Sequence, residues 1–339
     1  MKDFKGKIAF ITGGASGAGL GQAKVFAKAG MKVAIADMRM DALHKSVGEI
    51  VEYAGCGVSD ILPLCFNLTD RGEHIAADDA VERIFGKPPH LLIMTAGVNS
   101  FGPIEASTFD DFDWVKGVCL DAVIDGLVIF VPRMLRAYGG RDGVPKEGFH
   151  VAATSSMGGF AGGGSPYSMS KGAVNNLMYG YNQALSTYGG AATVICPANI
   201  NSDIGNAEKY RPPHLLNRGY HVSEGTMAHL SSIHAKGIDP IELAEILKEG
   251  IENRRVVVFP DRNRDQWVDR IRGLHQHVED YPLTEEERKK KIEERMVSGG
   301  GRPHNPDRGQ DWSVPEGAEG FGSARKDLDY IDPSRNPKW

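Results

Sequence analysis

Long hydrophobic runs are missing from this sequence, and so is an excess of positive charge. No apolar run approaches the roughly 20 residues that a membrane-spanning helix needs. The chain carries 39 lysines and arginines against 44 aspartates and glutamates, which gives a formal net charge of −5. Such a chain lacks the basic field that attracts nucleic acid. We therefore predict no membrane partner and no nucleic-acid partner.

Cysteine is also scarce, and its spacing excludes two further kinds of site. The four cysteines form no Cys-x-x-Cys pair and lack the spacing of zinc ligands. The N-terminal residues run directly into a predicted strand, so we expect no signal peptide. Reduced thiols are typical of cytoplasmic proteins, so we predict a cytoplasmic location. The cysteines are Cys56, Cys65, Cys119 and Cys196.

What the sequence does contain is an alternation of short apolar runs and helical stretches as far as residue 260. Apolar runs at 8–11, 32–36, 91–94, 148–153, 192–196 and 256–259 predict buried strands. Helices are predicted between them, among others at 19–29 and 40–52. Strands that are apolar throughout and separated by helices indicate a parallel sheet covered on both faces. The predicted fold class is α/β, with a doubly wound parallel sheet.

Beyond residue 260 the character of the chain changes twice. Trp267, Ile271 and Leu274 recur at helical spacing, and Thr284 opens a capping box for a second, charged helix that ends near Met296. From 299 onward glycine, proline and charged residues dominate without a period. We predict a single domain at 1–260, a helical extension at 261–298 and a loose polar tail at 299–339.

A glycine-rich segment, Thr12–Gly19, lies directly after the first predicted strand and leads into a helix. Glycines there permit a tight turn and the close approach of a pyrophosphate, whose charge then lies at a helix N-terminus. Asp37 ends the second predicted strand, where its carboxylate can accept from both ribose hydroxyls of NAD and would repel the 2′-phosphate of NADP. We therefore predict NAD. Arg39, which can pair with that phosphate, keeps NADP as an alternative.

Tyr167 and Lys171 are spaced by four residues in a predicted helix, so that they share one face. An ammonium one turn from a phenol favours the phenolate and lowers the tyrosine pKa from its reference of about 10. Such a tyrosine can serve as the acid/base for an alcohol or a carbonyl near neutral pH. Taken alone, the spacing also fits a helix with a half-buried tyrosine and a solvated lysine.

The pattern Thr-Gly-x-x-x-Gly-x-Gly, followed by Tyr-x-x-x-Lys, resembles the short-chain dehydrogenase/reductase family over roughly residues 5–260. The resemblance implies a single Rossmann-type domain with a seven-stranded sheet, assembled as a homodimer or homotetramer. It makes Tyr167 the acid/base, with Lys171 lowering its pKa and binding the nicotinamide ribose. Ser156 would hold the substrate oxygen. Ser155 is the alternative, because the interval to Tyr167 is short and the loop 160–166 should be tight.

The same resemblance assigns a set of cofactor-binding positions, to which Tyr167 and Lys171 also belong. Asn67 and Leu68 stand where the family touches the adenine, and Ile200 and Ser202 where it meets the nicotinamide carboxamide. Together these positions are Gly13, Ser16, Gly17, Ala18, Gly19, Asp37, Asn67, Leu68, Ala96, Gly97, Ile200 and Ser202.

Cys119 is the clearest departure from the family pattern. The family has an asparagine there, which marks a kink in a long helix and whose main-chain carbonyl holds a water linked to the catalytic lysine. The carbonyl survives the change, but a thiol is a weak hydrogen-bonding group. We expect slower turnover, or a proton path organised differently.

A narrower resemblance concerns the substrate. The segments 1–4, 95–105, 110–114 and 197–200 look like those of the Cα-dehydrogenases, which use NAD to oxidise the benzylic alcohol of lignin-derived β-aryl ethers. The segment 205–229 stands where the family carries a lid over its substrate. A mostly apolar lining that tolerates aromatic rings is predicted near the cleft. Its residues are Asn99, Phe101, Met157, Phe160 and Ile204.

The leading prediction is the NAD-dependent oxidation of a hydrophobic, aryl secondary alcohol, with the hydride passing to NAD and the proton to Tyr167. One alternative is an NADPH-dependent ketone reductase that uses Arg39. Another is a cofactor-binding protein with little catalysis because of Cys119. Hydride transfer needs no metal, and we predict none. The histidines lack carboxylates at ligand spacing; they include His221, His229, His234, His275 and His277.

Overall fold

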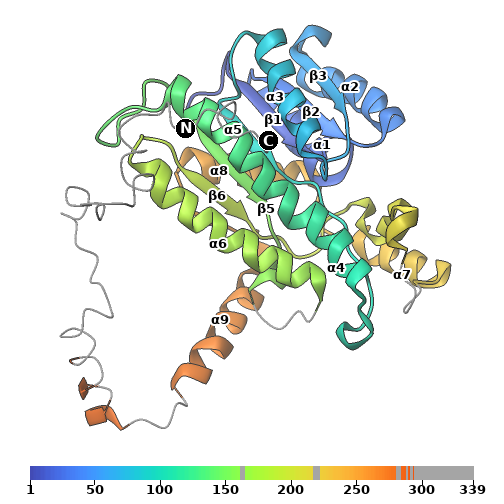
Figure 1. Ribbon diagram of the computed structural model, residues 1–339, viewed down its shortest axis with the longest axis vertical. Coiled ribbons are helices and arrows are strands. Elements are labelled where there is room, and N and C mark those ends of the chain that lie inside the picture. The colour runs from blue at the N-terminus through green and yellow to red at the C-terminus, as the bar shows by residue number, and fades with distance from the viewer. Residues whose placement is uncertain (161–164, 217–221, 280–283, 288, 291–292, 294–339) are drawn as a thin grey trace, which may run out of the picture. The chain divides into compact units, whose positions relative to one another are not determined.

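The computed structural model describes residues 1–160, 165–216, 222–279, 284–287, 289–290 and 293. Its central feature is a sheet of seven parallel strands in the order β3-β2-β1-β4-β5-β6-β7 (Figure 1). The strand order reverses between β1 and β4, which pair directly. This confirms the predicted doubly wound, Rossmann-type sheet. The strands are β1 (Ile8–Thr12), β2 (Lys32–Asp37), β3 (Ile61–Cys65), β4 (Leu91–Met94), β5 (His150–Thr154), β6 (Ala192–Ile195) and β7 (Val257–Val258).

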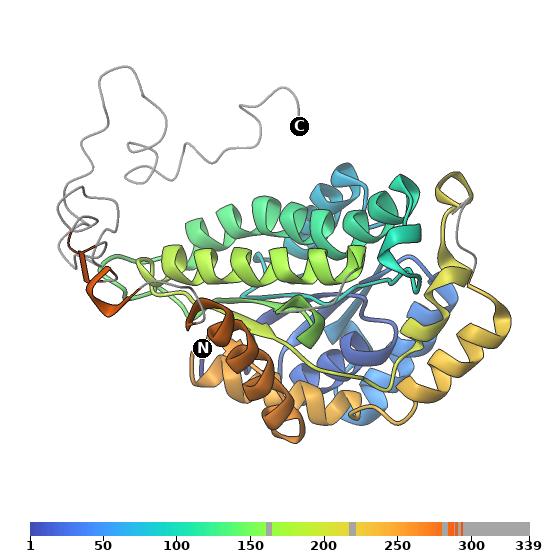
Figure 2. The ribbon, with the colours of Figure 1, turned by 90° about the horizontal axis from the view of Figure 1, so that it is seen from below.

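Helices cover both faces of the sheet, because a parallel strand can follow another only through a crossover. Figure 2 shows α4, α5 and α6 on one face, and α1 and α8 on the other. Within the described residues, no helix is both long enough and apolar enough to cross a bilayer. The helices are α1 (Gly17–Lys28), α2 (Met40–Ala54), α3 (Arg71–Phe85), α4 (Phe109–Lys116), α5 (Ala122–Tyr138), α6 (Pro166–Ser186), α7 (Glu224–His234), α8 (Pro240–Glu252) and α9 (Arg264–Glu279).

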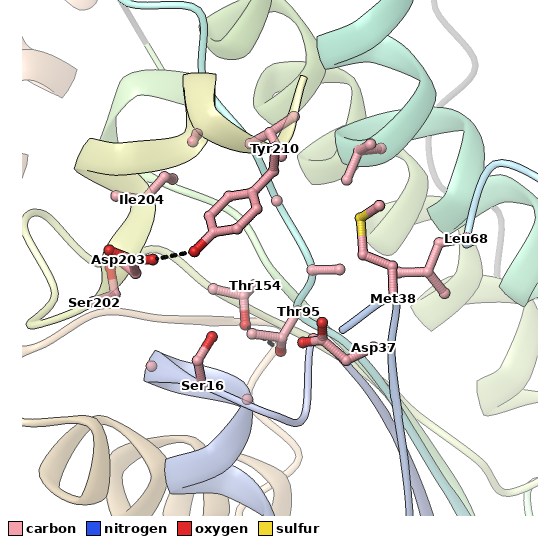
Figure 3. A pocket seen from close by; sticks show the side chains of 18 of the residues that line it. Ser16, Asp37, Met38, Leu68, Thr95, Thr154, Ser202, Asp203, Ile204 and Tyr210 are labelled. Atoms are coloured by element: carbon pink, nitrogen blue, oxygen red, sulfur yellow. Dashed lines mark hydrogen bonds between the residues drawn. The ribbon is translucent and has the colours of Figure 1, made fainter. Parts of the chain in front are cut away.

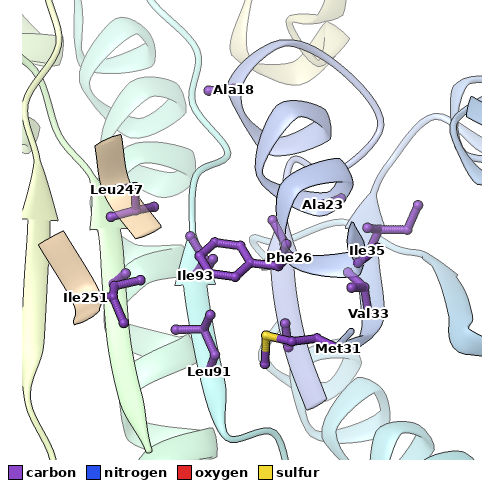
Figure 4. Packing of buried hydrophobic residues seen from close by; sticks show 14 of the residues in the cluster. Ala18, Ala23, Phe26, Met31, Val33, Ile35, Leu91, Ile93, Leu247 and Ile251 are labelled. Carbon is purple, nitrogen blue, oxygen red and sulfur yellow. The ribbon is translucent and has the colours of Figure 1, made fainter. Parts of the chain in front are cut away.

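Apolar side chains fill the layer between the sheet and the helices α1, α2 and α8. Figure 4 shows Phe26 of α1 in this layer with Ile93 of β4 and Ile35 of β2, and all three side chains are fully buried. Every residue of β1 is buried, because this strand has a neighbour on each side and helices over both faces. Burying one large apolar side chain contributes about 1.5–3 kcal/mol. The layer therefore fixes the carboxyl ends of β1, β2 and β4.

The strand β3 is absent from the sequence-based prediction. It lies at the edge of the sheet, where only every second side chain or so is enclosed, and its burial alternates along Ile61–Cys65. Pro63 lies in its middle, which an edge strand tolerates because one side needs no hydrogen bonds. A search for strands that are apolar throughout misses an edge strand of this kind.

The C-terminal extension is described only in part. The helix α9 begins at Arg264, and its Trp267 is 1% exposed, packed against Phe259 and Phe160. Further on, Thr284 and Glu287 form the predicted capping box, with the Glu287 N–H donating to the Thr284 hydroxyl over 3.3 Å. The rest of that predicted helix includes residues outside the described ranges, and the predicted tail at 299–339 lies wholly outside them. The domain boundaries at 260 and 298 stay predictions.

Candidate active site

A cavity of about 350 Å³ opens at the carboxyl ends of the strands, beside the point where the strand order reverses. Open α/β sheets bind their ligands at this position, because the loops that leave the two neighbouring strands diverge there. Figure 3 shows Ser16 and Asp37 on one side of the cavity and Tyr210 and Ile204 across from them. All the sequence-predicted cofactor positions line this cavity. Their binding role stays a prediction, but the structure brings them together.

The loop between β1 and α1 is as tight as the glycine pattern predicted. Gly13 has a φ of +69°, and a Cβ at this position would lie 2.9 Å from the Cα of Ala96. A Cβ at Gly19 would lie 2.1 Å from the carbonyl oxygen of Gly13, so that α1 packs directly on the loop. Ser16, Gly17 and Ala18 open the helix at the cavity wall, with no acidic residue in the first turn. An uncompensated helix N-terminus suits a pyrophosphate.

Asp37 and Arg39 form an ion pair at the end of β2. The Asp37 carboxylate, which is 7% exposed, accepts from Arg39 Nε over 3.0 Å and from Arg39 Nη2 over 3.2 Å. Arg39 Nη2 also donates to the Ser16 hydroxyl over 2.7 Å, and the guanidinium lies 5.2 Å from the centre of the Tyr210 ring. The carboxylate raises the pKa of Arg39 further above its ordinary value. Asp37, which favours NAD, and Arg39, which favours NADP, are therefore hydrogen-bonded to each other.

Tyr167 and Lys171 lie on the first turns of α6. Ser165 caps that helix by accepting from the Ser168 N–H over 3.1 Å, and Pro166 occupies the first turn, where its missing N–H costs nothing. Lys171 is 3% exposed, and its Nζ donates to the Thr154 carbonyl over 2.8 Å. The ammonium lies 5.5 Å from the centre of the Tyr167 ring.

The pKa of Tyr167 differs from the sequence-based expectation. Its burial raises the pKa of the phenol above the ordinary value, and a hydrogen bond with the Ser156 side chain offsets this only in part. Burial likewise lowers the pKa of Lys171, which the nearby Cys119 and Cys196 thiols oppose. The Lys171 ammonium, 5.5 Å from the centre of the ring, does not offset the effect of burial on the tyrosine pKa. The phenol is therefore protonated at neutral pH.

The two candidate serines have different partners. Ser155 is 1% exposed, and its hydroxyl donates to the Lys171 carbonyl over 3.0 Å, so that it ties β5 to α6. Ser156 accepts from the Gly158 N–H over 3.1 Å and shares a hydrogen bond with Tyr167. The geometry therefore favours Ser156 as the residue that holds a substrate oxygen. The predicted tightness of the loop 160–166 stays a prediction, because residues 161–164 lie outside the described ranges.

Cys119 lies in a single π-helical turn, η3 (Gly117–Asp121), between α4 and α5. Its thiol is fully buried and bonds to both backbone groups of Val98, accepting from the N–H over 3.4 Å and donating to the carbonyl over 3.2 Å. Burial raises the pKa of this thiol. A π-helical turn thus occupies the position at which the family pattern implies a helix kink, and the thiol makes two hydrogen bonds to the neighbouring loop.

Most of the predicted substrate residues do not line the cavity that the predicted cofactor positions line. Ile204 lines the cavity, whereas Asn99, Phe101, Met157 and Phe160 do not. Met157 is 5% exposed in the core, and Phe160 packs edge-on against Trp267, with ring centres 4.3 Å apart. Phe101 lines a separate, much smaller cavity. The role of these residues in substrate binding stays a prediction, but the structure does not bring these four side chains to the cavity wall.

An apolar wall also lines the cavity, and sequence reasoning found it only in part, since four of its seven members lie in the segment 205–229, where a lid was predicted. Its members come from the loop after β4, from α4, from η3, and from the segment 203–215, which includes η5 (Asp203–Tyr210) and η6 (Pro213–Leu215). The segment 110–114 entered the sequence comparison, but nothing marked Trp114 as a lining residue. The wall consists of Val98, Trp114, Val118, Ala207, Tyr210, Pro212 and Leu215.

Among the residues that the structure describes, no group of three or more His, Cys, Asp or Glu could hold a metal ion.

Comparison with known proteins places this site in a family. A family model described as "short chain dehydrogenase" matches residues 7–211. The "C alpha-dehydrogenase" of Sphingobium sp. strain SYK-6 is 47% identical over 262 residues, which make up 77% of this chain and 82% of that protein. The chain belongs to the short-chain dehydrogenase/reductase family, as its motifs predicted. Within it, the likeness to the C alpha-dehydrogenase supports the narrower resemblance.

Two solved structures agree with this placement. The apo form of LigD from Sphingobium sp. strain SYK-6 aligns with a TM-score of 0.65 at 38% identity, over 83% of this chain and 100% of that one. A short-chain dehydrogenase/reductase from Burkholderia phymatum in complex with NAD aligns with a TM-score of 0.73 at 28% identity, over 84% and 99%. Family members of this fold bind a nicotinamide dinucleotide.

Proposed function

We propose that this protein oxidises a hydrophobic aryl secondary alcohol to the ketone, with NAD as the hydride acceptor. The observation that carries the proposal is that Ser156, Tyr167 and Lys171 line the same cavity as the aromatic and apolar side chains of Trp114 and Leu215. The similarity to the Sphingobium C alpha-dehydrogenase supports the class of reaction. A cytoplasmic location and a homodimer or homotetramer stay predictions.

The residues at the cavity fit a dinucleotide. The loop at Gly13 runs so close to Ala96 that no side chain fits, which leaves backbone at the N-terminus of α1 to meet a pyrophosphate. Asp37 offers carboxylate oxygens for ribose hydroxyls at the end of β2. When bound, NAD would supply the acceptor for the hydride that leaves the carbinol carbon.

The chain's own groups handle the proton of the alcohol. Ser156 would hold the substrate oxygen by a hydrogen bond. Tyr167, the hydrogen-bond partner of Ser156, would take the hydroxyl proton. Lys171, held by the Thr154 carbonyl, keeps an ammonium beside the phenol. Because burial raises the pKa of Tyr167, we expect oxidation to accelerate with rising pH until the phenol has lost its proton.

The substitution Tyr167→Phe tests the proposal. Removing a positioned acid/base lowers turnover by roughly 10²–10⁴-fold, so we expect a loss of that order in NADH formation across a panel of aryl secondary alcohols. NAD affinity, measured by calorimetry, should change little. The matched control is Tyr179→Phe on the same helix, whose side chain is 45% exposed and outside the cavity. A loss of less than about tenfold for Tyr167→Phe would overturn the mechanism.

The reductase that uses NADPH remains the second candidate because Arg39 lies at the position where a 2′-phosphate would be met. Its guanidinium is bound to Asp37, and the carboxylate would repel a phosphate there. We therefore expect higher kcat/KM with NAD than with NADP. Faster turnover with NADP in the wild-type protein would favour the reductase.

A further inference from the structure

Arg211 joins two segments that are far apart in the sequence and that both line the cavity. Its Nη2 lies 2.7 Å from the Asp111 carboxylate of α4, one hundred residues away along the chain. Its Nε lies 2.7 Å from the Glu208 carboxylate of η5, and its Nη1 donates to the Leu215 carbonyl of η6 over 3.1 Å. The segment 203–215 is therefore attached to α4 through one guanidinium.

These charges are buried. The side chains of Arg211 and Asp111 are 1% and 2% exposed, and that of Glu208 is 14% exposed. Buried ion pairs contribute little to stability compared with apolar side chains of the same size, but separating their partners leaves an uncompensated buried charge, which is strongly destabilising. Asp111 is itself held in place, because its carboxylate accepts from the Thr108 N–H over 2.8 Å in the capping box of α4. This end of the contact is rigid.

The same guanidinium covers one side of a tryptophan. The Cζ of Arg211 lies 4.3 Å from the centre of the Trp114 ring, within the range of a cation–π contact. Trp114 is 3% exposed and lines the cavity. It belongs to a buried apolar cluster with Ala207, and Val118, Leu215 and Tyr167 pack against that cluster. The indole cannot turn away without losing its contact with the arginine.

We propose that Trp114 is the surface that recognises the aryl ring of the substrate, and that Arg211 is a positioning residue that fixes Trp114 and the segment 203–215 around it. The proposal rests on the proposed function and names the substrate group that the site selects. Planar aryl rings pack against an immobile indole in offset or edge-on geometry, and gain more than their area alone provides. A saturated ring of the same size lacks this gain.

The test uses the full-length protein with two matched alcohols, 1-phenylethanol and 1-cyclohexylethanol, and NAD. The wild-type protein should prefer the aryl alcohol. Trp114→Leu should lower kcat/KM for the aryl alcohol about tenfold more than for the saturated one. NAD affinity should be unchanged. An unaltered ratio of the two kcat/KM values in a folded, NAD-binding Trp114→Leu protein would overturn the role of Trp114.

Arg211→Met tests the positioning role. We expect the KM for the aryl alcohol to rise about tenfold more than kcat falls, together with faster hydrogen–deuterium exchange in peptides from 203–215. Arg211→Lys keeps the charge beside Asp111 and Glu208 but loses the planar stack on Trp114. It should therefore show the same larger effect on KM than on kcat, and it serves as the test if Arg211→Met does not fold. The control is Arg133→Met, which removes an arginine paired with Asp78 between α3 and α5.

Unchanged exchange in 203–215 in both Arg211 variants would overturn the positioning role. If the wild-type protein oxidises neither alcohol, the proposed function fails and the aryl selectivity fails with it. The exchange measurement still decides the role of Arg211 in that case, because it needs no substrate.

Discussion

A single thiol at position 119 does more than the sequence suggested. Sulfur is a weak partner in hydrogen bonds, and the sequence therefore predicted slower turnover or a differently organised proton path. In the structure the Cys119 thiol both accepts from and donates to Val98, in the loop that passes Lys171. A Cβ placed on Gly97 would lie 3.6 Å from the Cys119 sulfur and 3.6 Å from Lys171 Nζ. The thiol therefore supports the wall of the site next to the lysine, which weakens the argument for a protein without catalysis.

Cys119→Ala should lower the free energy of unfolding, because it removes these two hydrogen bonds. The N–H and carbonyl of Val98, a half-buried residue, would lose their partner, and a polar group left unsatisfied away from water costs about 1–3 kcal/mol. We expect urea unfolding to show a loss of that size, with Cys119→Ser closer to the wild type because a hydroxyl also donates and accepts. Cys65→Ala, at an exposed cysteine, is the control. If Cys119→Ala were as stable as the wild-type protein, the thiol would contribute nothing to the loop.

At the scale of elements, a closed ring of hydrogen bonds joins α1 to the ends of β4 and β5. The Thr95 hydroxyl donates to Gln22 Oε1 over 2.6 Å, and Gln22 Nε2 donates to the Thr154 hydroxyl over 3.2 Å. The two hydroxyls are 2.8 Å apart, so Thr154 donates to Thr95 and completes the ring. Thr154 also presents its carbonyl to Lys171. Gln22 on α1, which is fully buried, thus hydrogen-bonds to Thr154, the residue whose carbonyl holds Lys171.

Gln22→Leu should weaken this connection. The substitution keeps the volume but leaves the Thr95 and Thr154 hydroxyls with only each other, at a cost of about 1–3 kcal/mol. We expect that loss in the free energy of unfolding, together with a lower kcat that raising the concentration of NAD does not restore. Gln183→Leu makes the same change at an exposed position of α6. Equal kcat values for the Gln22→Leu and wild-type proteins would show that the ring does not reach Lys171.

The elements differ in how far the sequence could predict them. The central strands were predictable because burial on both faces makes them apolar throughout, whereas edge strand β3 alternates and contains Pro63. That the proposed cofactor positions would gather at one cavity was predictable, because glycines and Asp37 lie at fixed distances from strand ends. The place of Trp114 in the cavity wall was not, since it meets Ala207 and Leu215 only after segments far apart in the sequence have packed together.

At the scale of the whole molecule, stability in acid depends on histidines that fold without charge. His90 lies just before β4 and is 2% exposed, and its Nδ1 accepts from the Ile8 N–H over 3.1 Å. The ring stacks on Tyr138 of α5, and its Nε2 lies 3.0 Å from the Glu147 carboxylate. Burial lowers the pKa of His90 to about 4, and the opposing effect of Glu147 is smaller. Protonating Nδ1 would also break the bond to Ile8, and with it a link between β1 and the start of β4.

The sign of the resulting pH dependence follows from this lowered pKa. An unfolded histidine titrates near pH 6.5, so the unfolded chain takes up the proton first. The stability that neutral His90 contributes is complete above that pH and is lost as the pH falls toward 4. One proton gives a slope of about 1.4 kcal/mol per pH unit.

His90→Asn keeps an acceptor for the Ile8 N–H. It should make the loss of unfolding free energy with falling pH shallower by about one proton, measured by urea unfolding between pH 7 and 4. His150, whose pKa burial also lowers, leaves part of the slope in place. His44→Asn, on the exposed side of α2, should behave as the wild type; equal slopes in all three proteins would mean that His90 does not couple folding to pH.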